Sequence, residues 1–225
     1  LQRYMDTTRA DMLFSRGVIF VEGDAEAQLV PVFASSLGLN LDELGVSVCS
    51  VGGTNFSPYA KLAAALRLPF SIITDWDPRA APHQAYGWGR TQSLIADIRS
   101  ARGTPALTPV EVGLISNDEL ALRAAALQHN IFLNTTTLET EVAADANLRN
   151  PLLDVLLQQD FGPELTARLQ SWRDGTVAID NHQLMLMIGY VSKGRFAGQL
   201  AAALVGQAPP PYVASAIYRS VNGVA

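Results

Sequence analysis

Two short apolar segments of this chain each run directly into a group of carboxylates. Residues 18–21 (VIFV) lead into the motif EGDAE, which begins at Glu22, and residues 70–74 (FSIIT) lead into DWD, which begins at Asp75. Buried parallel strands bring their carboxyl ends to one edge of a sheet, where open α/β folds place their sites. Carboxylates gathered there repel one another unless a cation lies between them. The pattern therefore predicts a divalent-metal site and favours a metal-dependent phosphoryl-transfer enzyme.

Strand-like and helix-like patterns alternate in the first third of the chain. We expect a helix at residues 24–37, a strand at 46–51, a helix at 57–66 and a strand at 70–74, after the first strand at 18–21. Gly52 and Gly53 follow the second strand directly. This order predicts an α/β fold with a parallel sheet, right-handed crossovers and helices on both faces.

The middle of the chain gives weaker signals. We expect an ordered loop at 78–90, a helix at 91–102, a strand at 110–114, a capping box at 116–119 before a helix at 120–129, and a short strand at 131–133. From residue 144 to residue 190 the periodicity is helical, and no strand is expected. We therefore predict a core over residues 1–144, a helical subdomain at 145–190, a return to the core at 191–207, and a proline-rich linker with a last helix at 208–225.

Composition excludes several classes of protein. The 225 residues are 48% hydrophobic, so a large core is expected, and the single cysteine, Cys49, excludes an intrachain disulfide and a cysteine-based zinc cluster. No apolar run has membrane-spanning length and no leader precedes the first strand, so we expect a soluble, intracellular chain. The net charge of −5 does not argue against a nucleic-acid partner, because a bound metal reverses the local field.

The strand-end acids occur in pairs whose spacing is compatible with a shared ligand. Glu22 and Glu26 are four residues apart, which places both on one face of a helix, although acids also favour the first turn of any helix. Asp75 and Asp77 point to the same side if the segment is extended. An ordinary turn stabilised by aspartate is the alternative for that second pair.

Later residues complete the candidate set. Glu139 and Glu141 follow three threonines and share a side if the segment is extended, with a solvated loop as the alternative. Lys193 and Gly194 stand at an expected helix N-terminus, where a cation is disfavoured unless an anion binds there. An ordinary surface lysine is the alternative. Lys193 is the only cation expected beside the acids, and no phosphate loop for ATP occurs in the chain.

The ordered set of motifs resembles a Toprim domain, the metal-binding α/β module of topoisomerases, primases and certain nucleases. The matching segments are VIFVEGDAE at 18–26, VGG at 51–53 and ITDWD at 73–77. The segments TLE at 137–139 and KGRFA at 193–197 are similar to the C-terminal half of the OLD (overcoming lysogenization defect) nucleases, and DMLFS at 11–15 is similar to the end of their ATPase region. The resemblance covers about residues 10 to 205.

The resemblance implies roles for individual residues. It implies metal binding by Glu22, Glu26, Asp75, Asp77 and Glu139, with Glu22 as an alternative general acid or base, and charge stabilisation by Lys193. The second-tier candidates are Asp24 and Glu141, which lie beside matching positions, and the glycines of the matching segments, Gly52, Gly53 and Gly194. The implied reaction is two-metal hydrolysis of DNA by Mg²⁺ or Mn²⁺ in a bacterial-type cytoplasm. The implied partners are DNA and an N-terminal ATPase domain of the same polypeptide, through which a homo-oligomer could form.

Two other readings remain open at this point. A HAD-like phosphatase also uses an Asp-x-Asp pair after a strand, but it needs the pair near the chain start and a Thr or Val where Arg79 stands. A non-catalytic Toprim-like module for DNA docking or dimerisation would keep the acids as structural groups. It predicts no metal binding and no loss of function when Asp75 is replaced.

Overall fold

Four parallel strands form the centre of the molecule. The computed structural model describes residues 10–224, and within them the sheet has the order β2-β1-β3-β4. The strands are β1 (Gly17–Val21), β2 (Val46–Ser50), β3 (Phe70–Thr74) and β4 (Ile131–Leu133). In the register, Val18 of β1 is paired with Phe70 and Ser47, and Ile72 is paired with Ile131. All pairs are parallel, as the sequence predicts.

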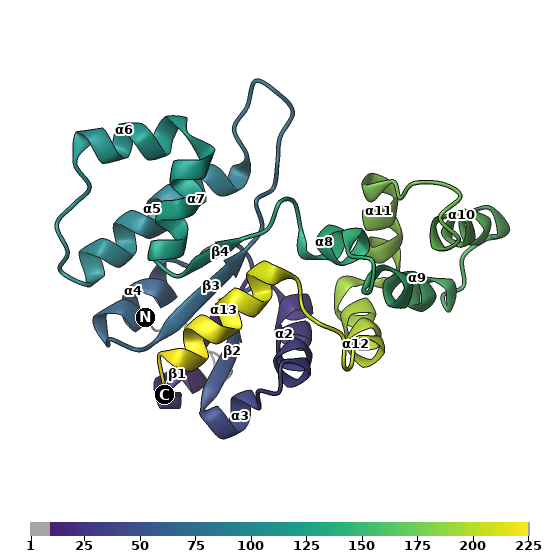
Figure 1. Ribbon diagram of the computed structural model, residues 1–225, viewed down its shortest axis with the longest axis horizontal. Helices are drawn as coiled ribbons and strands as arrows, with labels where there is room; N and C mark the ends of the chain where they lie inside the picture. The colour runs from purple at the N-terminus through teal and green to yellow at the C-terminus, as the bar shows by residue number, and fades with distance from the viewer. Residues whose placement is uncertain (1–9, 225) are drawn as a thin grey trace.

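Helices cover both faces of the sheet because strand side chains alternate between two apolar cores. Ile19, Val21 and Ile73 enter one core, and Val18, Phe20 and Ile72 enter the other. The first core is covered by α2 (Asp24–Ser36) and α13 (Pro211–Asn222), and the second by α4 (Ser57–Ala65), α5 (Tyr86–Ala101) and α7 (Glu119–Gln128). Figure 1 shows α13 lying across the sheet. The doubly covered parallel sheet confirms the predicted fold class.

The strand order fixes where a site can form. From β1 the chain crosses to β2 on one side, and from β2 it returns past β1 to β3 on the other side. The carboxyl ends of β1 and β3 are therefore neighbours at the point where the connections diverge. Crevices at such switch points hold the ligands of open α/β sheets. Glu22 and Asp75, which directly follow these two strands, meet there.

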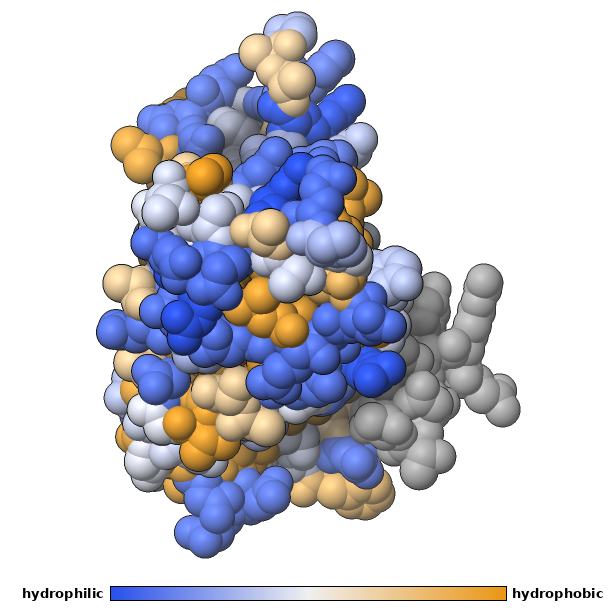
Figure 2. All heavy atoms as spheres, turned by 90° about the vertical axis from the view of Figure 1, so that its right-hand side faces the viewer, coloured by the Kyte–Doolittle hydropathy of each residue, from blue (hydrophilic) through white to orange (hydrophobic). Residues whose placement is uncertain are grey.

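A group of helices lies beside the sheet (Figure 1). It consists of α8 (Leu138–Ala144), α9 (Arg149–Leu157), α10 (Pro163–Arg173), α11 (Asn181–Val191) and α12 (Lys193–Ala203). The helix α12 contacts α2 as well as α9 and α11, so the apolar core of this group is continuous with one sheet face. Seen from this side, hydrophobic patches are interspersed with hydrophilic ones (Figure 2). Exposed Leu186 and Tyr190 belong to α11.

Three expectations for the middle of the chain are wrong. Residues 110–114 are not a strand, because they lie in α6 (Pro109–Asn117), whose capping box joins Thr108 and Glu111. The expected capping box at 116–119 is not formed, since Ser116 and Asn117 are the last residues of α6 and Asp118 caps α7 by accepting hydrogen bonds from two backbone amides. The expected loop at 78–90 is shorter, because α5 begins at Tyr86.

Two shorter helices complete the described elements, η1 (Asp11–Phe14) and α3 (Leu41–Leu44). The last helix, expected within residues 208–225 after the prolines, is confirmed by α13, which packs against β1, β3 and β4. Its Ser220 is buried and pairs with Ser71 of β3. Within residues 10–224 we find no helix with the length and apolar character that a bilayer span requires.

Candidate metal centre

The carboxyl ends of β1 and β3 border a cavity of about 340 Å³. Its lining is acidic and glycine-rich, and consists of Glu22, Gly23, Asp24, Ala25, Glu26, Gly52, Gly53, Asp75, Glu139 and Gly194. Carboxylates from three segments that are far apart in the sequence thus share one cavity: Glu22 and Glu26, Asp75, and Glu139. The second-tier candidates Asp24, Gly52, Gly53 and Gly194 also line it. Asp77 and Glu141 do not.

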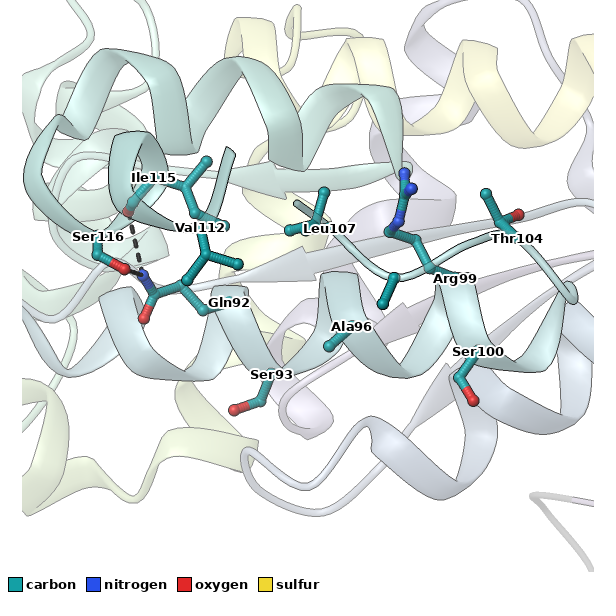
Figure 3. A pocket seen from close by; sticks show the side chains of 11 residues that line it. Gln92, Ser93, Ala96, Arg99, Ser100, Thr104, Leu107, Val112, Ile115 and Ser116 are labelled. Atoms are coloured by element: carbon teal, nitrogen blue, oxygen red, sulfur yellow. Dashed lines mark hydrogen bonds between the residues drawn. The ribbon is translucent and has the colours of Figure 1, made fainter. Parts of the chain in front are cut away.

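A larger cavity elsewhere in the fold has a different character. It measures about 530 Å³, lies between α5 and α6, and is drawn in Figure 3. Leu107, Val112 and Ile115 form its apolar middle, and the amide of Gln92 donates to the Ile115 carbonyl and the Ser116 hydroxyl at one end. Its lining contains no carboxylate. The acidic cavity is therefore the better candidate for ion chemistry.

Glu22 is fixed by the ends of neighbouring strands. Its Oε1 accepts hydrogen bonds from the Thr74 hydroxyl at 2.5 Å and from the Asp75 backbone N–H at 3.0 Å. Gly52 and Gly53 have φ angles of 71° and 131°, values that favour glycine. The turn lets the Gly53 N–H donate to the backbone carbonyl of Glu22 at 2.7 Å. Strand-end hydrogen bonds therefore orient this carboxylate.

Glu26 combines capping with a place in the cavity. Its Oε2 accepts from the backbone N–H of Gly23 at 3.2 Å, as the capping alternative predicts for a first-turn glutamate. Glu26 lies one helical turn after Glu22 and lines the same cavity. Helix capping and participation in the acidic cavity are thus compatible at this residue.

The second acidic pair is split by the backbone. Asp77 has a φ of 52°, so the segment is not extended and the same-side expectation for Asp75 and Asp77 is wrong. The Oδ1 of Asp75 accepts from the side-chain amide of buried Asn134 at 2.5 Å. The Oδ2 of Asp77 instead accepts from Arg90 at 3.1 Å. Only Asp75 of this pair lines the cavity.

The late pair is split by helix geometry. Glu139 and Glu141 lie in α8, not in an extended segment, so side chains two residues apart point about 200° away from each other. Glu139 is buried and lines the cavity. Glu141 turns back and accepts from the backbone N–H and hydroxyl of Thr135 at 2.6 and 2.7 Å. The expectation that both face one side is wrong.

Arg90 is the site residue that the sequence did not reveal. From α5 its Nη2 lies 3.1 Å from Asp77 Oδ2 and 3.4 Å from Glu22 Oε1, and it also donates to the backbone carbonyl of Asp75. Its side chain is only 11% exposed. The expectation that Lys193 is the only cation beside the acids is therefore wrong. No sequence signal marked Arg90, because it follows Asp75 by 15 residues in a segment that was expected to be a loop.

These strand-end motifs and the sheet are found in known proteins. The family described as "Overcoming lysogenization defect protein-like, TOPRIM domain" matches residues 13–77. The solved C-terminal region of the Xanthomonas campestris pv. campestris OLD protein is 34% identical, with a TM-score of 0.78 over 94% of this chain and 97% of that one. This chain belongs to the OLD family. No curated protein matches it at a significant level.

A second solved structure of the OLD family matches this chain equally well. The C-terminal region of the Burkholderia pseudomallei OLD protein is 33% identical, with a TM-score of 0.78 over 94% of this chain and 100% of that one. Both solved chains are C-terminal regions, so the OLD proteins from which they come also have a part that precedes them. The matching fold is the α/β Toprim-like architecture described above.

Electrostatics couple the carboxylates of this OLD-family site. Burial, together with the charges of Glu22, Glu26 and Glu139, raises the pKa of Asp75 to about 8 against the opposing hydrogen bond from Asn134. Burial also raises the pKa of Glu26, with Glu139 and Glu22 adding to the increase. These side chains are therefore close enough to oppose each other's ionisation, which a bound cation would relieve.

The carboxylate oxygens of the cavity suit a hard cation, although the side chains are not arranged around a common point. Carboxylate oxygens are the ligands that Mg²⁺ and Mn²⁺ prefer. In the part of the chain that the structure describes, no three His, Cys, Asp or Glu side chains are gathered so that they could hold an ion as they stand. Glu22 and Asp77 both contact Arg90 instead. The chemistry of these side chains fits a metal, and a bound ion would require them to move.

Proposed function

We propose that this OLD-family chain is a divalent-metal-dependent DNA endonuclease, the phosphodiester-hydrolysing part of a larger ATPase–nuclease. The observation that carries the proposal is the meeting of Glu22, Glu26, Asp75 and Glu139 in one cavity at the switch point of the sheet. Family membership supports the nuclease class. DNA as substrate would place the protein in the cytoplasm of a bacterial-type cell.

Oxygen atoms suitable for metal binding remain available at the strand ends. Among the described residues, Oε2 of Glu22 and Oδ2 of Asp75 have no hydrogen-bond partner, whereas the other oxygen of each carboxylate is held by Thr74 or Asn134. We propose that Glu26 and Glu139 complete the ligand set, and that Asp77 joins it on leaving Arg90. Two bound Mg²⁺ or Mn²⁺ ions would supply an activated water and stabilise the departing oxygen.

Lys193 is proposed to stabilise the charge that develops on the phosphate. It is the first residue of α12, its side chain lies outside the described part of the structure, and the following residue, Gly194, lines the cavity. A positioned cation of this kind contributes about 10²–10³ in rate. Glu22, which Thr74 orients, is the proposed general acid or base if it does not remain a metal ligand.

A non-catalytic docking module is the second candidate. Arg90 favours it, because its contacts with Glu22 and Asp77 neutralise part of the acidic edge without a metal. In that case the cavity would need no ion.

We further propose that an N-terminal ATPase part supplies ATP hydrolysis in the whole protein, since the solved OLD relatives are C-terminal regions. Oligomerisation through that part stays a prediction.

Nicking of supercoiled plasmid DNA tests the proposal. Cleavage should require Mg²⁺ or Mn²⁺, stop in EDTA, and fall at least about 100-fold in Asp75→Asn, which removes one charged ligand. Lys193→Ala should slow cleavage similarly while calorimetric metal titration stays unchanged. The control is Asp154→Asn, an exposed acid paired with Arg173 on the helical group, which should cleave at the parent rate. Robust cleavage in EDTA would refute the metal mechanism.

A further inference from the structure

A polar hollow of about 550 Å³ lies at the opposite end of the sheet from the acidic cavity. It is bordered by the residues that follow α4, by the C-terminal end of α5 and by the start of β3. Its lining includes Arg67, Leu68, Phe70, Arg102, Gly103 and Asn130, and we refer to it as the arginine pocket. The strand β3 has five residues, so roughly 16 Å separates this pocket from the acidic cavity.

Two separate parts of the fold bring guanidinium groups to the lining of the arginine pocket, and a third brings one to Asn130, another residue of that lining. Arg67 follows α4, Arg102 follows α5, and Arg219 extends from α13. The Nε of Arg219 donates to Oδ1 of Asn130 at 2.6 Å, which fixes it at the border of the pocket. The guanidinium carbon of Arg102 lies 5.4 Å from the ring centroid of Phe70. The convergence is therefore a product of tertiary packing.

These cations have no acidic partner within the described residues. No carboxylate oxygen of residues 10–224 lies within 4.0 Å of Arg67, Arg102 or Arg219, and the first two guanidinium groups make no hydrogen bond to that part of the chain. Burial lowers the pKa of Arg102, and the like charge of Arg219 lowers it further. The whole chain has a net charge of −5, so general basicity does not explain the cluster.

Helix ends account for only part of this charge. Arginine is favoured at helix C-termini, and all three residues stand at or just after one. Helix α7 also ends here, just before Asn130, so four helix ends contribute about half a negative charge each and offset about two of the three positive charges. A surplus of about one positive charge remains at this end of the sheet. Such a surplus attracts an anion from solution.

We infer that the arginine pocket binds a phosphate group. Guanidinium groups bind phosphate through paired N–H donors, and Arg67 and Arg102 have all of theirs free of the described residues. The side-chain amide nitrogen of Asn130 is a further donor, since only its oxygen is engaged by Arg219. The volume suits a mononucleotide, and the open border would also admit a phosphate of the DNA backbone.

Binding to two phosphate probes in EDTA tests this site without the metal centre. Adenosine 5′-monophosphate is titrated by calorimetry, and a short fluorescein-labelled DNA duplex is titrated by anisotropy at several salt concentrations. The test variant combines Arg67→Asn with Arg102→Gln; asparagine is chosen because Arg67 has a φ of 57°, which asparagine tolerates. The control combines Arg168→Gln with Arg173→Gln, which removes the same charge from arginines paired with Glu164 and Asp154.

The test variant should bind at least one probe about tenfold more weakly than the parent and the control. Loss of nucleotide binding identifies a site for a free phosphate compound. Loss of duplex binding alone, with a salt slope lower by about two, identifies contacts to the DNA backbone. If the test variant and the control bind both probes alike, or the parent binds neither, the inference is overturned. Both probes are titrated in EDTA, without the metal on which the nuclease proposal depends, so the failure of either proposal is distinguishable from the failure of the other.

Discussion

At the carboxyl end of β3, Asp75 is half-buried beside three other carboxylates and the side chain of Arg90, whereas at its amino end Arg67 and Arg102 border an open hollow. Water screens the exposed arginines, so they can remain without a protein partner. Burial forces the acids to be protonated, paired or bound to a cation. The same strand thus separates an end whose charges affect stability strongly from an end whose charges are available to ligands.

The largest expected difference between the two ends is in the cost of removing an arginine. Arg90→Gln leaves the half-buried carboxylates of Glu22 and Asp77 without their cation and should lower the free energy of unfolding in EDTA by about 3 kcal/mol, the lower end of the range for buried pairs. Arg102→Gln removes an exposed charge that has no acidic partner among the described residues, and should change the free energy of unfolding by less than about 0.5 kcal/mol. Urea unfolding measures both. Equal losses of stability in the two variants would contradict the distinction between the ends. Added Mg²⁺ should restore part of the stability that Arg90→Gln loses.

The next effect is a pH dependence that originates at the acidic end. Because the folded pKa of Asp75 is raised from 3.8 to about 8, its contribution to stability is fully present below pH 3.8 and is lost as the pH rises towards 8. Asp75→Asn mimics the protonated form, so in EDTA it should be more stable than the parent at pH 8 by on the order of 2 kcal/mol. Thermal unfolding at pH 5 and pH 8 measures this. A variant that is less stable at both pH values would make Asp75 a structural acceptor for Asn134.

The smallest effect marks the boundary of the acidic end within α8. Glu141→Gln weakens two exposed hydrogen bonds to Thr135 and should cost about 1 kcal/mol of stability while the plasmid-nicking rate stays at the parent value. Glu139→Gln should lower that rate and weaken Mg²⁺ binding, because Glu139 lines the acidic cavity. If Glu141→Gln instead nicked plasmid DNA more slowly than the parent, Glu141 on the far side of α8 would also belong to the acidic end.

Several features of the fold were predictable because they depend on local patterns. Apolar runs at residues 18–21 and 70–74 separated by helical periodicity define parallel strands, and strand polarity alone brings Glu22 and Asp75 to one edge. Residues 110–114 were not predictable from their β-branched composition. The capping box of Thr108 and Glu111 instead begins a helix there.

The composition of each charged end was decided by tertiary structure. Arg90 meets Glu22 only because α5 packs over the sheet, and Arg67, Arg102 and Arg219 meet only because three helices end around one strand. Sequence alone determined which residues terminate the strands, since that follows from short-range periodicity. It could not determine which distant cation faces which acid or which face of α8 carries Glu139. Those contacts depend on helix phase and on packing between segments that are remote along the chain.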